Sequence, residues 1–204
     1  MAETLVSMKN LVLAEHPLFI VDMMYARDDN IVGRAVYKEI GFGNKAYVHK
    51  DVWKALLKIV PYLEKSNLKL RICDAYRPPL AHMKLLESVP MKGLFAQSAE
   101  KSNHCHGTAI DVCLTDINGK NLIYPTQIDA YEKCFQEQIC SGDFDEFGIH
   151  LQKARHDYMQ ASAEEIANRN ILKNIMENIG FEAIPHEWWH YNLKNWKNYP
   201  LINW

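Results

Sequence analysis

The segment Ala-Ile-Asp-Val-Cys-Leu at residues 109–114 constrains the fold more than any other, because it predicts a buried strand with an acid in its middle. Along such a strand Ile110, Val112 and Leu114 face one side, and Asp111 faces the other. A carboxylate in so apolar a strand is unfavourable unless a cation or hydrogen bonds satisfy it. The chain must therefore bring a partner to this strand, and the alternatives are a metal ion and an arginine.

Two compact stretches supply candidate ligands for a metal ion. The first has the pattern Ser-x-His-x-x-Gly-x-Ala-x-Asp from Ser102 to Asp111, in which Gly107 allows a backbone conformation that other residues disfavour. The second is Glu-Trp-Trp-His-Tyr at residues 187–191. Each stretch combines histidine with an acid, which are the side chains that a metal site requires.

His104, Asp111 and His190 form a ligand set that suits a borderline metal such as Zn²⁺, with one coordination position left for water. Glu187 lies close to His190 in sequence and is a candidate general base for that water. We therefore predict a catalytic zinc site with one ion per chain. The alternative is structural, because single histidines are more often surface or core residues and Asp111 could pair with an arginine.

Both stretches resemble the zinc-binding motifs of the D-alanyl-D-alanine dipeptidases, which belong to the zinc D,D-peptidases related to the hedgehog fold. Residues 74–78, Asp-Ala-Tyr-Arg-Pro, resemble the Asp-Gly-Tyr-Arg-Pro segment of that family. Phe144-Asp145 resembles a Phe-Asp pair that follows the first metal motif, and residues 175–183 lead into the second motif as they do in the dipeptidases. The resemblance extends over residues 20–195.

The resemblance also implies which residues bind the substrate. It places Asp145 and Tyr25 at the free amine of a dipeptide, with Ser102 near the carboxylate. Each has a structural alternative: Asp145 as a loop acid, Tyr25 as a half-buried aromatic residue and Ser102 as a turn residue. The sequence departs from the family pattern by extra residues at 121–140, which could reshape the cavity.

Arg77 is the candidate partner for the oxyanion that forms during peptide hydrolysis. It follows a predicted strand and directly precedes Pro78-Pro79. A preorganised donor of this kind contributes about 3 kcal/mol to catalysis. The alternative role of Arg77 is an ordinary salt bridge. By contrast, His106 is not expected to bind metal, because the family motif uses only the first histidine of the pair.

The pattern of apolar residues predicts strands alternating with helices but no regular βαβ repeat. We therefore expect an α+β fold, with a central, mainly antiparallel sheet flanked by helices, related to the hedgehog and D,D-peptidase fold. The expected strands are 18–24, 68–73, 109–114 and 181–191, with a hairpin at 117–122. The expected helices begin at a cap on Asp51, at Leu80 and at a capping box in residues 162–165, the last ending at Gly180.

The last of these strands raises a geometric problem. On a regular strand Glu187 and His190 point to opposite faces, yet the family resemblance implies that both reach the metal site. We therefore predict an irregularity near Trp188-Trp189.

Length and composition limit the possible partners. The chain has 204 residues, 48% of them hydrophobic and 24% charged, which is typical of a single globular domain, here residues 1–204 with a core at about 20–195. A net charge of −2 and the absence of a basic run give no indication of nucleic acid, and no apolar stretch is long enough to span a membrane. The expected partner is a small dipeptide, and the oligomeric state is not predicted.

The five cysteines are odd in number and have no framework spacing, and the N-terminal residues do not resemble a signal peptide. The expected compartment is the cytoplasm, or the periplasm if a leader has been removed.

Three functions remain to be distinguished. The first is a zinc dipeptidase that hydrolyses D-alanyl-D-alanine to two D-alanine molecules, in cell-wall turnover, D-alanine recovery or glycopeptide resistance. The second is a zinc D,D-carboxypeptidase or endopeptidase that acts on peptidoglycan stem peptides. The third is a zinc-binding module without catalysis, against which the presence of Glu187 and Arg77 weighs.

Overall fold

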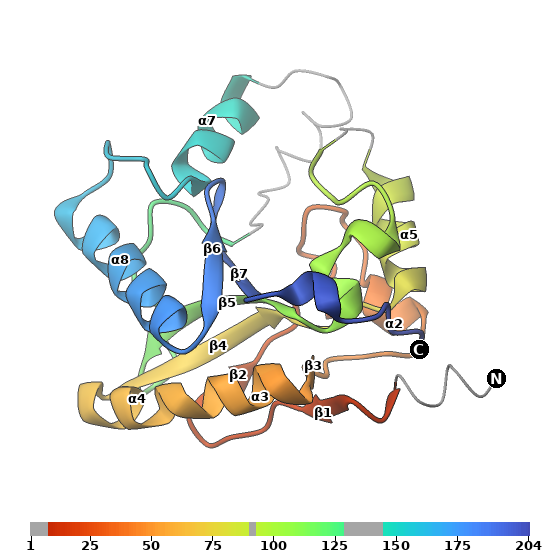
Figure 1. Ribbon diagram of the computed structural model, residues 1–204. Coiled ribbons are helices and arrows are strands. Elements are labelled where there is room, and N and C mark those ends of the chain that lie inside the picture. Colours follow the sequence, from red (N-terminus) through yellow and green to blue (C-terminus); the bar gives the residue numbers. More distant parts are fainter. Residues whose placement is uncertain (1–7, 90–92, 129–144) are drawn as a thin grey trace.

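A five-stranded mixed sheet forms the centre of the computed structural model, which describes residues 8–89, 93–128 and 145–204. The strand order is β2-β4-β5-β7-β6, in which β2 and β4 are parallel and every other pair is antiparallel (Figure 1). The strands are β2 (Phe19–Val21), β4 (Leu68–Asp74), β5 (Ala109–Asp116), β6 (Phe181–Ile184) and β7 (Glu187–Leu193). A two-stranded sheet pairs β1 (Leu11–Leu13) with β3 (Tyr47–His49). The fold is α+β and mainly antiparallel, as predicted.

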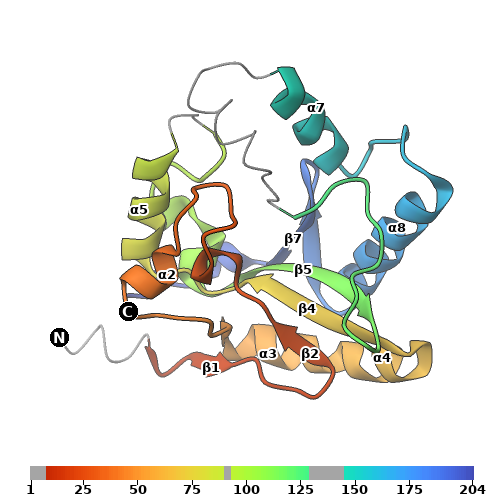
Figure 2. The ribbon, with the colours of Figure 1, turned by 180° about the vertical axis from the view of Figure 1, so that it is seen from behind.

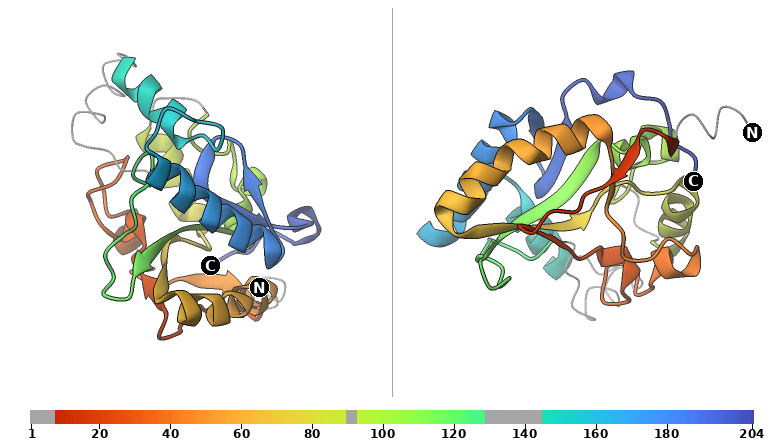
Figure 3. Two further views of the ribbon diagram at one scale, coloured as in Figure 1. Left: turned by 90° about the vertical axis from the view of Figure 1, so that its left-hand side faces the viewer. Right: turned by 90° about the horizontal axis from the view of Figure 1, so that it is seen from below.

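Two short helices joined by a 3-10 turn cover one face of the sheet, as Figures 1 and 3 show. They are α3 (Lys50–Leu56), η2 (Leu57–Ile59) and α4 (Val60–Ser66). Their fully buried side chains are those of the predicted stripe, namely Val52, Leu56, Ile59 and Leu63. The predicted cap on Asp51 is wrong: His49 is the N-cap, and its side chain accepts a hydrogen bond from the Asp51 N–H.

The other face of the sheet carries the helices and loops around the predicted site (Figure 2). The helices on this side are α2 (Val36–Glu39), α5 (Pro79–Ser88) and α7 (Asp145–Ala154), with 3-10 turns η1 (Met24–Ala26), η3 (Ala99–Lys101), η4 (Asn103–His106) and η5 (Trp196–Asn198). Helix α8 (Ala163–Asn178) packs against β6 and contacts β5 and β7 on the side of Tyr191, away from Asp111 and His190. Helix α8 starts with the predicted capping box between Ser162 and Glu165, and Gly180 follows its end with a φ of 108°.

Three sequence expectations differ from the structure. The predicted strand at 18–24 is shorter, because η1 begins at Met24. The expected strand at 181–191 is a hairpin of β6 and β7, because Pro185, which has no N–H to donate, lies in a tight turn between them. The hairpin at 117–122 is limited to a turn and one bridge between Thr115 and Asn121, and β5 pairs with β4 and β7 instead.

Within the described ranges, no helix combines the length and apolar character needed to cross a membrane.

Candidate metal centre

Asp111 and His190 are direct neighbours on paired strands. Asp111 of β5 lies opposite His190 of β7 in the antiparallel register, so both side chains point to the same face of the sheet. The His190 Nδ1 atom lies 2.9 Å from Asp111 Oδ1, and both residues are buried. The sheet register therefore brings together a carboxylate and an imidazole that are far apart in the sequence.

His104 reaches the same point from η4, which ends at Gly107. This glycine has a φ of 68°, and a Cβ atom built on it would lie 3.0 Å from Leu11 Cδ2 and 3.3 Å from the His49 backbone nitrogen. The turn places His104 Nε2 at 3.2 Å from His190 Nδ1 and at 3.5 Å from Asp111 Oδ2. All three ligand atoms lie within 4.8 Å of one another.

The second nitrogen of each imidazole is bound to an oxygen. His104 Nδ1 donates to the Ala75 carbonyl oxygen at 2.7 Å, and His190 Nε2 donates to Asn192 Oδ1 at 2.9 Å. The Asn103 side-chain amide donates to the same oxygen of Asn192 at 2.6 Å. These bonds leave a lone pair on His104 Nε2 and on His190 Nδ1, the two nitrogens that face Asp111. The donor set therefore fits a zinc ion.

The charges of the site favour an ionised Asp111. Burial alone would raise its pKa, but His104 and His190 hold the pKa of this carboxyl well below its usual range. Burial would likewise lower the pKa of His104, yet the Asp111 carboxylate raises it. The anionic carboxylate is the form that binds a metal.

Glu187 is the first residue of β7 and reaches the site through an irregularity. Ala183 of β6 pairs with Tyr191, but the next residue of β6, Ile184, pairs with Glu187. Strand β7 therefore bulges between Glu187 and Tyr191. The Tyr191 hydroxyl donates to the Trp188 carbonyl oxygen at 2.9 Å inside this bulge. Glu187 Oε2 consequently lies 3.8 Å from His190 Nδ1. The irregularity predicted near Trp188-Trp189 is confirmed.

Arg77 is buried and held on several sides. Its Nε and Nη2 atoms donate to Asp74 Oδ2 at 3.1 and 2.7 Å, and the Tyr37 hydroxyl donates to Asp74 Oδ1 at 2.6 Å. The Tyr25 and Phe95 rings flank the guanidinium carbon at 5.1 and 5.4 Å. Burial would lower the pKa of Arg77, but Asp74 holds it well above its usual value. Arg77 therefore forms the salt bridge of the alternative interpretation and also faces the site.

A cavity of about 340 Å³ gathers the predicted residues. Of the predicted site residues, its lining includes Tyr25, Arg77, Ser102, His104, Asp111, Glu187 and His190. Asp145 begins α7, and its side chain lies outside the described part of the structure, as does most of the 121–140 insertion. A larger cavity of about 590 Å³, between Arg71 and Trp188, contains none of the predicted residues.

Sequence reasoning missed several residues that shape the site. Asp74 belongs to the quoted Asp-Ala-Tyr-Arg-Pro segment, but nothing in the sequence showed that it binds Arg77. Asn192 lies two residues after His190 and so shares its face of β7, a signal that strand periodicity could have provided. Phe95 and Lys101 also line the cavity, but no local pattern marks either one. The ring nitrogens of His106 face the backbone carbonyl oxygens of Tyr199 at 2.8 Å and Glu100 at 3.0 Å, outside the candidate metal cluster.

A buried set of two imidazoles and one carboxylate, opening onto a cavity with a further carboxylate, is typical of a metallohydrolase. Comparison with known proteins agrees. A family model described as D-Ala-D-Ala dipeptidase matches residues 16–200. The chain is 33% identical over 183 residues to the D-alanyl-D-alanine dipeptidase of Escherichia coli K12, covering 89% of this chain and 82% of that protein. It is 28% identical over 194 residues to the D-alanyl-D-alanine dipeptidase of Enterococcus faecium, covering 85% of each.

The chain therefore belongs to the D-Ala-D-Ala dipeptidase family, and it is a zinc metallopeptidase. The resemblance inferred from the sequence motifs is confirmed.

Proposed function

We propose that this protein is a dipeptidase that hydrolyses D-alanyl-D-alanine to two D-alanine molecules, with one zinc ion bound by His104, Asp111 and His190. The observation that supports this most is the arrangement of the two imidazoles, each with one nitrogen bound to an oxygen and the other facing Asp111. The cavity of about 340 Å³ is in the size range of small-ligand sites and can hold a dipeptide.

Zinc, when bound, is a Lewis acid that lowers the pKa of a coordinated water to about 7. Glu187 accepts the proton of the attacking water on its carboxylate and then donates it to the leaving amine. The position of Glu187 Oε2, 3.8 Å from His190 Nδ1, supports this role because the base lies beside a proposed metal ligand.

Arg77 stabilises the oxyanion of the tetrahedral intermediate with its buried guanidinium. The guanidinium donates to Asp74, and the Tyr37 hydroxyl holds the other oxygen of that carboxylate. The flanking rings of Tyr25 and Phe95 limit the rotation of the guanidinium. A donor fixed before the reaction needs no reorganisation when charge develops, which is why such groups contribute strongly to catalysis.

Substrate recognition is assigned to the two ends of the cavity. Asp145 and Tyr25 bind the ammonium group of the dipeptide, and Ser102 lies near its carboxylate. Tyr25 and Ser102 are buried residues of the cavity lining, which supports their assignment. We also assign the fold to the zinc D,D-peptidases related to the hedgehog fold, because Asp111 and His190 point to one face of a mainly antiparallel sheet and His104 joins them from η4.

The experiment that tests this proposal compares the purified zinc-loaded enzyme with Glu187→Gln on D-alanyl-D-alanine. The variant should keep its zinc but lose kcat by orders of magnitude, because only proton transfer is removed. A variant within a few-fold of wild type would exclude Glu187 as the base. An acylated tripeptide ending in D-Ala-D-Ala, assayed in parallel, identifies the carboxypeptidase alternative if it is the better substrate.

A further inference from the structure

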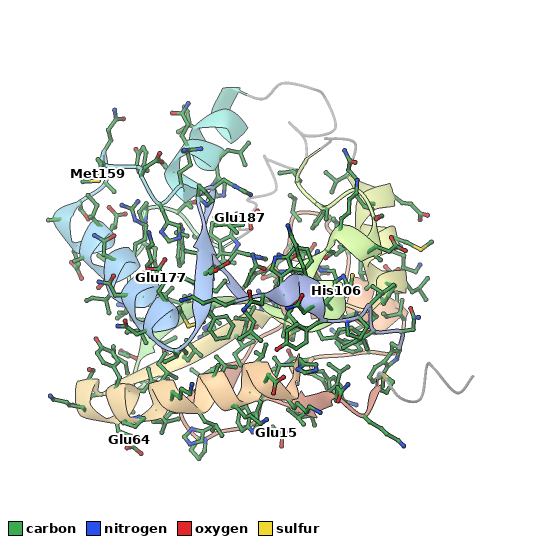
Figure 4. All side chains as sticks on the ribbon, in the orientation of Figure 1. Glu15, Glu64, His106, Met159, Glu177 and Glu187 are labelled. Carbon is green, nitrogen blue, oxygen red and sulfur yellow. The ribbon has the colours of Figure 1, made fainter. Side chains whose placement is uncertain are left out.

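The end of the hairpin that carries Glu187 extends beyond the support of the central sheet. Strand β7 pairs with β5 only from Asn192, opposite Ala109, to His190, opposite Asp111. In the described part of the chain, the strand register pairs Glu187 with Ile184 of its own hairpin and not with a residue of β5. Figure 1 shows this hairpin rising beside α7, and Figure 4 shows Glu187 near its tip. Something other than β5 must fix the direction of this segment.

The loop between α7 and α8 provides that support. The His156 N–H donates to the carbonyl oxygen of Pro185, in the turn of the hairpin, at 3.0 Å. The His156 ring also packs against the Tyr191 ring, with centroids 6.4 Å apart. Tyr191 in turn bonds to the Trp188 carbonyl oxygen in the bulge next to Glu187. The loop therefore contacts both the turn and the bulge of the hairpin.

Arg169 of α8 holds this loop. Its side chain is buried, with 1% of the residue exposed, and its Nη1 atom donates to the carbonyl oxygens of Arg155 at 3.0 Å and Tyr158 at 2.8 Å. Those carbonyls lie on either side of His156. Among the described residues no carboxylate lies within ion-pair distance of Arg169, although burying a charge without a partner is unfavourable. The Arg169 guanidinium therefore interacts with the backbone carbonyl oxygens of this loop.

We infer that Arg169 is a positioning residue for catalysis: by fixing the backbone around His156 it fixes the Pro185-His186 turn, and through that turn the direction of the Glu187 carboxylate. Arg169 itself does not line the cavity. The inference rests on the proposed role of Glu187 as general base. A carboxylate displaced by even about 1 Å can lower the rate by about a hundredfold, so a remote residue can have a large effect.

The test compares Arg169→Met and Arg169→Lys with a matched control, Lys173→Met, on the zinc-loaded enzyme. Lys173 lies one turn further along α8 and is partly exposed. We expect Arg169→Met to lower kcat by about tenfold to a hundredfold, with KM and zinc content within about twofold of wild type. Arg169→Lys should be intermediate, because one ammonium group can donate to the loop without reproducing both contacts. Lys173→Met should match wild type.

Hydrogen exchange distinguishes positioning from general destabilisation. Amides of residues 155–158 and of His186 and Glu187 should exchange faster in Arg169→Met, whereas those of β4 should not change. Wild-type kcat in Arg169→Met, or faster exchange throughout the sheet, would overturn the inference. If Arg169→Met does not fold while Arg169→Lys has wild-type kcat, Arg169 is a folding residue and the inference is also wrong. A fully active Glu187→Gln would instead refute the proposed base, so the two failures are distinguishable.

Discussion

At the scale of single residues, the candidate metal centre depends on contacts from outside the two stretches that hold its ligands. The residue types and motifs of His104, Asp111 and His190 were enough to predict that their side chains lie together. The sequence could not predict that the Ala75 carbonyl would hold the His104 imidazole, because these residues are far apart in the chain. The Asn192 contact joins two residues on the same face of β7, so strand periodicity could have predicted it. Such partners fix which nitrogen of a histidine is free to bind metal.

Zinc content tests the ligand assignment. The purified protein should contain about one zinc ion per chain, and His104→Ala or His190→Ala should lose it, because two remaining protein ligands bind zinc weakly. Elemental analysis after extensive dialysis measures this. His106→Ala is the control, since His106 bonds to backbone oxygens outside the cluster and its removal should leave the zinc in place. Full occupancy in both ligand variants would mean that other residues bind the metal.

At the scale of elements, the site is built where a 3-10 turn meets a strand and where a hairpin leaves the sheet. The sequence predicted β4, β5 and α8 because their apolar periodicity and capping residues are local signals. It did not predict the β6–β7 turn, because Pro185-His186 lacks the glycine or asparagine typical of two-residue hairpin turns.

Gly107 follows η4 and leaves little room for a side chain. Gly107→Ala should lower the free energy of unfolding by about 2–3 kcal/mol, because alanine is strained at positive φ and its Cβ meets Leu11 and the His49 backbone. Urea unfolding measures this loss, and a zinc competition assay should show weaker binding since His104 shifts.

Gly43→Ala is the matched control for this prediction. Gly43 has a φ of 73°, but no atom lies within 4 Å of an added Cβ, so only the conformational strain of about 1–2 kcal/mol remains. Equal losses in the two variants would show that the close packing around Gly107 contributes nothing.

At the scale of the whole molecule, the cavity combines residues from η1, the segment that follows β4, η4, β5 and the C-terminal hairpin. Part of its lining could be predicted from the family resemblance. Its size, its other lining residues and its separation from the larger cavity near Trp188 could not, because they depend on how loops pack over the sheet.

The proposed ammonium-binding role of Asp145 and Tyr25 leads to a prediction about substrates. If Asp145 and Tyr25 bind a free ammonium group, N-acetyl-D-Ala-D-Ala should be cleaved at least about a hundredfold less efficiently than the free dipeptide, because an unpaired buried carboxylate is strongly unfavourable. Steady-state kinetics on both compounds measures the ratio. Asp145→Ala should slow turnover of the free dipeptide and reduce the difference in cleavage efficiency between the free and the acetylated dipeptide. Equal cleavage of the two compounds would indicate an open, carboxypeptidase-like site.

Buried neutral histidines give the whole molecule a pH-dependent stability. Burial lowers the pKa of His82, His150 and His156 to about 4 from an ordinary value of 6.5. Above about pH 6.5 these groups are neutral in both states. As the pH falls from about 6.5 to 4 the unfolded chain binds protons that the folded chain does not. The free energy of unfolding should then fall by up to about 1.4 kcal/mol per pH unit for each group.

Urea unfolding of the metal-free protein at several pH values tests this dependence. His156→Phe should keep the aromatic contact with Tyr191 and reduce the slope by the contribution of one proton. An unchanged slope in this variant would show that His156 is not a neutral buried group.

The strand order also bears on how the protein behaves at high concentration. The two edges of the central sheet are its shortest strands: β2 has three residues and β6 has four, against seven or eight in the strands between them. Pro17 lies just before the first edge and Pro185 just after the second, and proline cannot donate a ladder hydrogen bond. Another chain therefore finds little free backbone for strand addition, and the fold is protected from aggregation by edge-to-edge sheet growth.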